Sequence, residues 1–254
     1  MAEAARRGAM RRDAISPQTR MALDAGHIES ATLVECLAVD HAALLLAVVP
    51  GLPARRLDPL RASAGAGITI RMRLSAELLA EHAELAPLSE HPSDTVRGWA
   101  AFALAGIPDL PLDQRLARIR RFADDRHFGV REWAWLAVRP AIVAEPDLAV
   151  ALLASWSRDL SAHLRRFASE ATRPRGVWAA HVAPFKREPE RGLPVLEPLR
   201  ADPSPYVQDS VANWINDAAR TRPDWVRLTC ERWATESDVP ATRRICRRAL
   251  RSLG

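Results

Sequence analysis

Apolar residues recur with helical spacing along most of the chain, most clearly in its C-terminal part. Between Val207 and Ala218 the apolar positions are separated by three or four residues, so they share one face of a helix. Ser210, Asn213 and Asp217 then fall together on another face. The pattern predicts an amphipathic helix whose polar face is a candidate functional surface.

Segments with similar beginnings divide the second half of the chain. Arg97, Arg131 and Arg165 occupy the fourth position of the first three segments and are spaced 34 residues apart. A period of this length fits a helical hairpin, so the fold expected is an all-α solenoid of HEAT-like repeats. The five beginnings are Asp94-Thr95-Val96-Arg97, Phe128-Gly129-Val130-Arg131, Ala162-His163-Leu164-Arg165, Pro205-Tyr206-Val207-Gln208 and Ala241-Thr242-Arg243-Arg244.

The repeats extend over most of one expected domain, residues 1–254. Residues 91–254 hold the clearer repeats, and residues 16–90 are expected to form atypical capping helices, as the ends of solenoids often do. Residues 1–15 form a basic segment that we expect to be disordered.

The composition suits a helical protein that contacts a polyanion. Hydrophobic residues make up 48% of the chain and charged residues 26%, with a formal net charge of +5. Lys186 is the only lysine, and arginine is the side chain that grips phosphates with two parallel hydrogen bonds. The same excess of arginine could reflect genomic base composition, so charge alone does not decide between these explanations.

Several protein classes are excluded by what the sequence lacks. The three cysteines form no C-x-x-C pair and are expected to be reduced thiols of a cytoplasmic protein. The apolar run from His41 to Pro50 is too short to cross a membrane, and the N-terminus lacks the apolar core of a signal peptide. No phosphate-binding glycine loop and no metal-ligand spacing occur, so neither a cofactor nor a metal is expected.

The segment from Leu164 to Trp178 carries the most distinctive polar pattern. Arg166, Glu170 and Arg173 are expected on one exposed ridge, which is either a surface ion-pair ladder or part of a binding site. Arg173-Pro174-Arg175-Gly176 predicts a stiff basic turn at a helix N-terminus, a natural anion site.

Trp178 is expected to begin the helix after this turn and, like Trp135, to stack on a base or sugar. The remaining tryptophans occupy apolar helical positions and are expected in the core.

These motifs resemble the AlkC branch of the HEAT-like DNA alkylation repair glycosylases. The pattern R-R-x-x-S-E-x-x-R-P-R-x-x-W begins at Arg165, and D-P-S-x-Y-V-x-x-S-V-A-N-x-x-N-D spans Asp202 to Asp217. The resemblance implies a C-shaped solenoid whose basic concave face holds duplex DNA. It also implies excision of N3- or N7-alkylated bases without a deep base-flipping pocket.

Site residues follow from the resemblance and from the residue patterns together. The active-site candidates are Glu170, Asp217, Trp178 and, less securely aligned, Glu132. The candidates for DNA contact are Arg131, Arg165, Arg166, Arg173, Arg175, Trp135 and Asn213. Some members of the family carry an additional immunoglobulin-like domain, which the sequence up to Gly254 does not include.

The implied chemistry needs negative charge near the sugar. A cationic alkylated purine is already a good leaving group, whereas the sugar develops oxocarbenium character that carboxylates can stabilise. The expected partner is duplex DNA with alkylated bases, bound by a cytoplasmic, nucleoid-associated bacterial monomer. The alternatives are a non-catalytic binder of damaged or branched DNA and a HEAT protein-interaction scaffold, which would carry an apolar or acidic surface instead.

Overall fold

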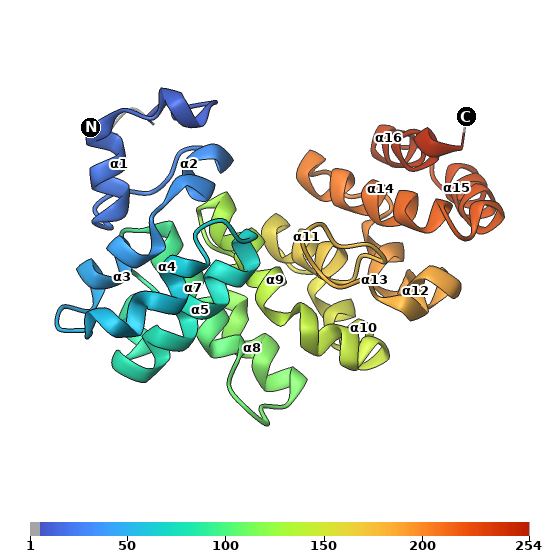
Figure 1. Cartoon of the computed structure of the whole chain (residues 1–254). Helices are drawn as coiled ribbons and strands as arrows, with labels where there is room; N and C mark the ends of the chain where they lie inside the picture. Colours follow the sequence, from blue (N-terminus) through green and yellow to red (C-terminus); the bar gives the residue numbers. More distant parts are fainter. Residues whose placement is uncertain (1–5, 254) are drawn as a thin grey trace. The chain divides into compact units, whose positions relative to one another are not determined.

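The computed structural model describes residues 6–253 (Figure 1). Within this range every regular element is a helix and no strand occurs, so the predicted all-α class is confirmed. None of these helices is both long and apolar enough to cross a membrane.

The helices follow one another in the order shown in Figure 1. The first eight α-helices are α1 (Pro17–Asp24), α2 (Leu33–Ala38), α3 (His41–Val48), α4 (Asp58–Ala62), α5 (Ile68–His82), α6 (Leu85–Leu88), α7 (Asp94–Ala105) and α8 (Leu112–Ala123). The next eight are α9 (Phe128–Ala144), α10 (Pro146–Trp156), α11 (Ala162–Ala171), α12 (Ala183–Arg187), α13 (Leu193–Leu196), α14 (Pro205–Ala219), α15 (Pro223–Glu236) and α16 (Pro240–Ala249). Short 3-10 helices are η1 (Arg12–Ala14), η2 (Ala54–Leu57), η3 (Pro189–Gly192), η4 (Glu197–Leu199) and η5 (Leu250–Ser252).

The helices gather into two compact units. Unit 1 holds the chain up to Pro108 together with Asp125–Ala134, and unit 2 holds Asp109–Asp124 together with the chain from Trp135 onward. Helix α9 is divided between the units: its residues up to Ala134 belong to unit 1, and those from Trp135 onward belong to unit 2. The expectation of one repeat domain over residues 1–254 remains a prediction.

Each predicted repeat beginning opens a helix. Helices α7, α9, α11, α14 and α16 start at or one residue before the predicted positions. Aspartates two residues ahead of the N-cap set up several of these starts: Asp125, Asp159 and Asp202 accept the backbone N–H two residues later at 2.7, 2.9 and 2.9 Å. These Asx-type turns fix the chain before each helix begins.

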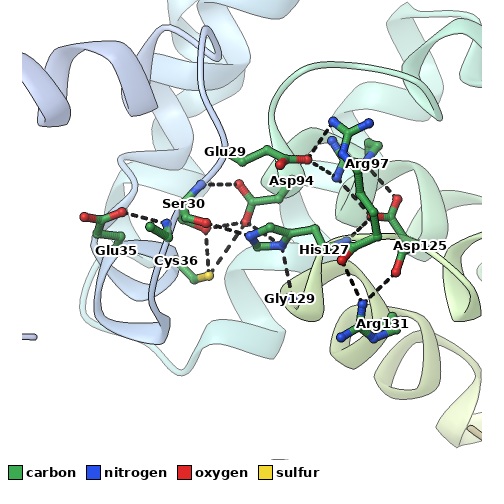
Figure 2. A network of polar contacts seen from close by, with 12 residues as sticks. Glu29, Ser30, Glu35, Cys36, Asp94, Arg97, Asp125, His127, Gly129 and Arg131 are labelled. Carbon is green, nitrogen blue, oxygen red and sulfur yellow. Dashed lines mark hydrogen bonds and ion pairs between the residues drawn. The ribbon is translucent and has the colours of Figure 1, made fainter. Parts of the chain in front are cut away.

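The repeated arginine ties each helix to the turn before it. In Arg97, Arg131 and Arg165 the Nη1 atom donates to the carbonyls six and five residues upstream at 2.7–3.2 Å, as Figure 2 shows for Arg131. Gln208 stands in this position in the fourth copy and donates to the Asp202 carbonyl at 2.8 Å. The repeat signature is therefore explained by turn stabilisation, whatever else these side chains contact.

Two of these arginines also bind the next repeat. Arg97 pairs with Asp125 at 2.9 Å, and Arg165 pairs with Asp202 at 2.6 Å. Each aspartate therefore accepts a backbone N–H of its own turn and also binds the arginine of the preceding repeat. We call this recurring contact the arginine–aspartate ladder.

The N-terminal segment differs from expectation where the structure describes it. Residues 1–5 of the predicted disordered tail lie outside the described residues. Arg6, in contrast, binds both oxygens of the buried Glu35 at 2.8 and 2.6 Å, and the chain continues into η1. A buried carboxylate needs such a partner, and this requirement orders the segment.

The core contains most of the predicted tryptophans. Trp99, Trp133, Trp214 and Trp233 are fully buried. Within unit 2, α14 packs against α11, α15 and α16, which makes it the central helix of that unit.

Candidate active site

The candidate site is built around Arg173, just beyond the end of α11 in unit 2. Its Nη1 atom donates to Glu170 Oε1 at 2.7 Å, while Nε and Nη2 bind the two oxygens of Asp217 at 2.9 and 3.2 Å. Glu170 lies in the last turn of α11 and Asp217 in the last turn of α14, and these helices pack together. One guanidinium therefore joins carboxylates from two repeats.

Glu170 is enclosed and fully hydrogen-bonded. Its side chain also accepts from Ser210 Oγ at 2.7 Å and lies 3.5 Å from Arg166, and the residue is only 4% exposed. Burial alone would raise the pKa of Glu170, but the positive charges of Arg166 and Arg173 and the hydrogen bonds outweigh burial and lower it. These contacts favour the ionised form of the buried Glu170 carboxylate.

The prediction of an exposed ridge is wrong. Arg166 and Glu170 are buried, and Arg173 is nearly so. These side chains are covered by tertiary packing, because α14 lies against α11. Tyr206, in the first turn of α14, stacks on the Arg166 guanidinium, with 5.0 Å between Arg166 Cζ and the centre of the Tyr206 ring. Helical spacing placed these residues on one face correctly but could not show that another helix covers it.

Asp217 is the more accessible carboxylate. Its side chain is 16% exposed, and its carbonyl oxygen accepts from Arg175 Nε at 3.2 Å. Burial raises the pKa of Asp217, although the hydrogen bonds and charge of Arg173 act in the opposite direction. Because a carboxylate offers about four lone-pair sites, two remain after the bonds to Arg173.

Arg139 fixes the turn that carries Arg173. It extends from α9 and donates to the carbonyls of Ala171, Arg173 and Ala180 at 2.6, 2.5 and 2.8 Å. Burial lowers the pKa of Arg139 to about 10. We did not identify this residue from the sequence, although an arginine inside the apolar stretch of α9 is a signal of a buried polar contact.

Trp178 projects from the same turn. It is 51% exposed and adopts a left-handed backbone conformation with φ of 59°. The prediction that it begins a helix is wrong, because α12 starts only at Ala183 and a left-handed residue does not fit an α-helix. A bulky residue held in this conformation is uncommon and presents its indole to solvent.

Several cations surround this turn. The pKa of His181 is lowered, first by desolvation and then by the nearby charges of Lys186, Arg175 and Arg139, while Asp217 acts in the opposite direction. An excess of cations favours an anion next to the turn.

The remaining predicted site residues do not bind the Arg173 side chain. Asn213 lies on α14 and accepts from Arg251 at 2.9 Å, and Trp135 is buried rather than available for stacking. Arg131 and Glu132 belong to unit 1, whereas the grouped residues belong to unit 2. Burial argues against the predicted stacking of Trp135 on DNA, and DNA contact by Arg131, Arg165 and Asn213 stays a prediction.

Unit 1 contains a second polar cluster with a thiol, a histidine and a carboxylate (Figure 2). Ser30 Oγ lies 2.8 Å from Cys36 Sγ and donates to Asp94 at 2.5 Å, while His127 Nε2 lies 2.6 Å from the Ser30 carbonyl. All four residues are buried, and burial followed by the Asp94 charge raises the pKa of the Cys36 thiol. An inaccessible protonated thiol does not act as a nucleophile, so we assign this cluster a structural role. Its hydrogen bonds join the segment from Ser30 to Cys36 to α7 and to the start of α9.

Within residues 6–253, no three His, Cys, Asp or Glu side chains gather as the ligands of a metal ion would.

The fold is that of a HEAT-like helical-repeat protein, and alkylpurine DNA glycosylases of known structure share it. AlkC of Pseudomonas fluorescens, solved with DNA containing an abasic site analog, is 28% identical with a TM-score of 0.66 over 84% of this chain. The match spans 61% of that protein. The resemblance to the AlkC branch is thus confirmed.

Further similarities are more distant or shorter. The Streptococcus mutans proteins smu.31 and AlkD2 both have a TM-score of 0.56, with 18% and 19% identity, and share the fold. They match 82% and 83% of this chain and 97% and 96% of their own. The uncharacterized protein YhaZ of Bacillus subtilis is 40% identical over 97 residues, which are 38% of this chain and 27% of that protein. No protein-family model matches the sequence.

Proposed function

We propose that the protein is a DNA glycosylase that excises cationic N3- or N7-alkylated purines from duplex DNA. The observation that carries this proposal is Asp217, a partly accessible carboxylate held in place by Arg173 beside a basic turn. The structural similarity to AlkC, whose solved complex contains DNA, supports the same assignment.

In the proposed reaction the bond between C1′ of the sugar and the purine nitrogen breaks. The electron pair moves to the base and neutralises its positive charge, so no general acid is required. The sugar becomes an oxocarbenium ion, which Asp217 stabilises, and water then adds to C1′ and transfers its proton to the Asp217 carboxylate.

The two carboxylates have different roles in this proposal. Asp217 faces the sugar and the attacking water through its remaining acceptor sites. Glu170 acts through Arg173, because its oxygens are bound by Arg173, Ser210 and Arg166. It is therefore a positioning residue that holds the guanidinium and, through it, Asp217.

DNA binding in this proposal relies on the basic turn. Arg175 and the exposed Trp178 lie on it, and the positive field around His181 attracts phosphates. The indole can stack on a base or on the deoxyribose, and its π face can contact the cationic purine. Glu132 and Arg131 belong to unit 1, and a role for them in this reaction stays a prediction.

The test is release of free base from duplex DNA methylated with dimethyl sulfate, followed by chromatography of the liberated purines. We expect release of N3-methyladenine or N7-methylguanine by the wild-type chain and strongly reduced release by Asp217→Asn. Asp224→Asn is the matched control, because Asp224 is an exposed carboxylate in α15 with an ordinary surface ion pair.

One observation favours the alternative of a non-catalytic binder of damaged DNA. Arg173 binds both carboxylates and together with Arg166 balances their two negative charges, which weakens the field that a sugar cation would experience. Binding of alkylated duplex without any base release would establish this alternative, and absence of DNA binding would favour the scaffold.

A further inference from the structure

Unit 1 contains a cavity that the proposed glycosylase reaction does not use. It has a volume of about 430 Å³ and lies where residues of η1, α1, α4 and α5 meet the N-terminus of α3. This is the size of a small-ligand site rather than of a packing defect. Its polar walls are formed mainly by Arg12, Arg20, Arg61 and Arg71.

The four guanidiniums have few carboxylate partners. Arg71 donates to the carbonyls of Leu37 and Val39 at 3.2 and 3.4 Å, and Arg20 donates to the carbonyl of Ala38. These bonds orient the cations without neutralising them.

The other two arginines differ from each other. Arg61 makes a weak ion pair of 3.3 Å with Asp58, three residues earlier on the surface of α4. Arg12 has no ion pair with any of residues 6–253, and its charge helps to lower the pKa of Arg71, after burial. Two neighbouring guanidiniums thus repel each other across the cavity.

The one carboxylate in the wall does not balance this charge. Asp40 Oδ1 accepts the N–H groups of Ala42 and Ala43 at 2.9 and 3.1 Å and so caps α3. Burial lowers the pKa of His41 to about 3, so this residue is neutral at physiological pH. Four arginines and one aspartate leave the lining with a net charge of +3.

Two buried nitrogens of the lining residues are also unsatisfied. His41 Nε2 and Arg71 Nε have no hydrogen-bond partner within residues 6–253. Buried polar atoms without partners are rare in folded proteins. Both nitrogens belong to residues of the cavity wall, and the excess of guanidiniums in that wall is what makes the cavity a candidate anion site.

We propose that this cavity binds a phosphate group carried by a small molecule or by the end of a DNA strand. Guanidiniums approaching from η1, α1, α4 and α5 can surround a tetrahedral dianion, for which arginine is well suited. Apolar side chains, among them Val39, Leu46 and Leu60, leave room for a compact group attached to the phosphate. The site is separate from Asp217, which belongs to unit 2.

Isothermal titration calorimetry of the full chain tests the proposal, with inorganic phosphate and deoxyadenosine monophosphate as probes. We expect saturable binding that Arg12→Gln weakens about tenfold, the usual effect of losing one charge-assisted contact. Arg12 is exposed, so its loss spares the fold. Arg73→Gln is the matched control, because Arg73 is an exposed arginine of α5 outside the cavity lining.

Comparison of duplexes with 5′-phosphate and 5′-hydroxyl ends distinguishes the two sources. Tighter binding of the phosphorylated end, lost in Arg12→Gln, assigns the cavity to a DNA terminus. Binding of the free nucleotide alone assigns it to a small molecule. The proposal is overturned if millimolar phosphate and nucleotide give no saturable heat, or if Arg73→Gln weakens binding as much as Arg12→Gln does. Asp217→Asn should bind phosphate like the wild type, so failure of the proposed glycosylase leaves this test intact.

Discussion

Asp217→Asn is the most informative perturbation, because it changes one charge and almost no volume. Arg166 and Arg173 contribute two positive charges to the candidate site, and Glu170 and Asp217 contribute two negative charges. The substitution makes the net charge of this group more positive by one unit. A sugar cation forming beside residue 217 then loses the adjacent negative charge that would stabilise it.

Coulomb's law gives the size of this effect for a carboxylate in contact with the sugar. A unit charge about 4 Å from the sugar cation contributes about 4 kcal/mol at an effective dielectric constant of about 20. Asp217 retains some exposure to solvent, which reduces the contribution. We therefore expect base release to slow by about 10²–10³-fold, in the range found when a single preorganised electrostatic group is removed.

Binding should respond differently from rate. The substitution removes a negative charge that repels phosphates in the ground state, so affinity for duplex DNA should be unchanged or higher. Single-turnover base release on methylated duplex measures the chemical step, and fluorescence anisotropy measures the affinity. Asp224→Asn should leave both quantities at wild-type values.

Two outcomes would refute this reasoning. Full base release by Asp217→Asn would show that Asp217 only neutralises Arg173. A parallel fall in rate and in affinity would show that the substitution disorders the site, which a lower melting temperature would reveal independently.

Further predictions concern the neighbouring residues and the solution conditions. Glu170→Gln removes the buried negative charge beside Arg166 and leaves Arg173 paired with Asp217, so it should lower the free energy of unfolding by about 3 kcal/mol, or roughly 6–12 °C in melting temperature measured by calorimetry; an unchanged melting temperature would contradict the burial argument. Trp178→Ala should leave the melting temperature unchanged but weaken DNA binding about tenfold by anisotropy, because the exposed indole has no packing role; destabilisation would instead indicate one. Burial raises the pKa of Asp217 above its ordinary 3.8 and only the ionised form stabilises a cation, so kcat/KM for base release should fall as pH drops through that raised pKa; a pH-independent acid limb would argue against the assignment. Affinity for duplex DNA should decrease linearly with salt on logarithmic axes, and salt-insensitive binding would favour the scaffold.

Much of the fold was predictable because the repeat signature reflects a local requirement. An arginine that donates to carbonyls five and six residues upstream must recur wherever that turn recurs, and the predicted repeat beginnings are confirmed as helix starts. We interpreted Arg131 and Arg165 as phosphate contacts, since sequence spacing cannot distinguish a guanidinium that binds a backbone from one that faces solvent. Gln208 illustrates this limit: its amide binds the Asp202 carbonyl as an arginine would.

The site was only partly predictable, for reasons of packing. Glu170 and Asp217 could be singled out by pattern and resemblance, but the bonds from Arg173 to both depend on how α11 meets α14. Arg139 was missed because its partners are carbonyls of a distant turn, which leave no trace in side-chain spacing. The left-handed conformation of Trp178 is likewise fixed by this turn rather than by the residue type.

The arginine–aspartate ladder has a consequence for how the protein loses structure. Asp202 accepts both the Ser204 N–H of its own turn and the Arg165 guanidinium of the preceding repeat, so opening one repeat exposes unpaired groups in the next. With Gln208 in the arginine position, α16 is joined to α14 instead by Arg244, which binds Gln208 at 3.1 Å and Asp209 at 2.7 Å, and by Arg248, and these ion pairs are more exposed than that of Arg165 with Asp202. Amide hydrogen exchange should therefore proceed inward from α16, with the helices between Arg165 and Asp202 opening together and last.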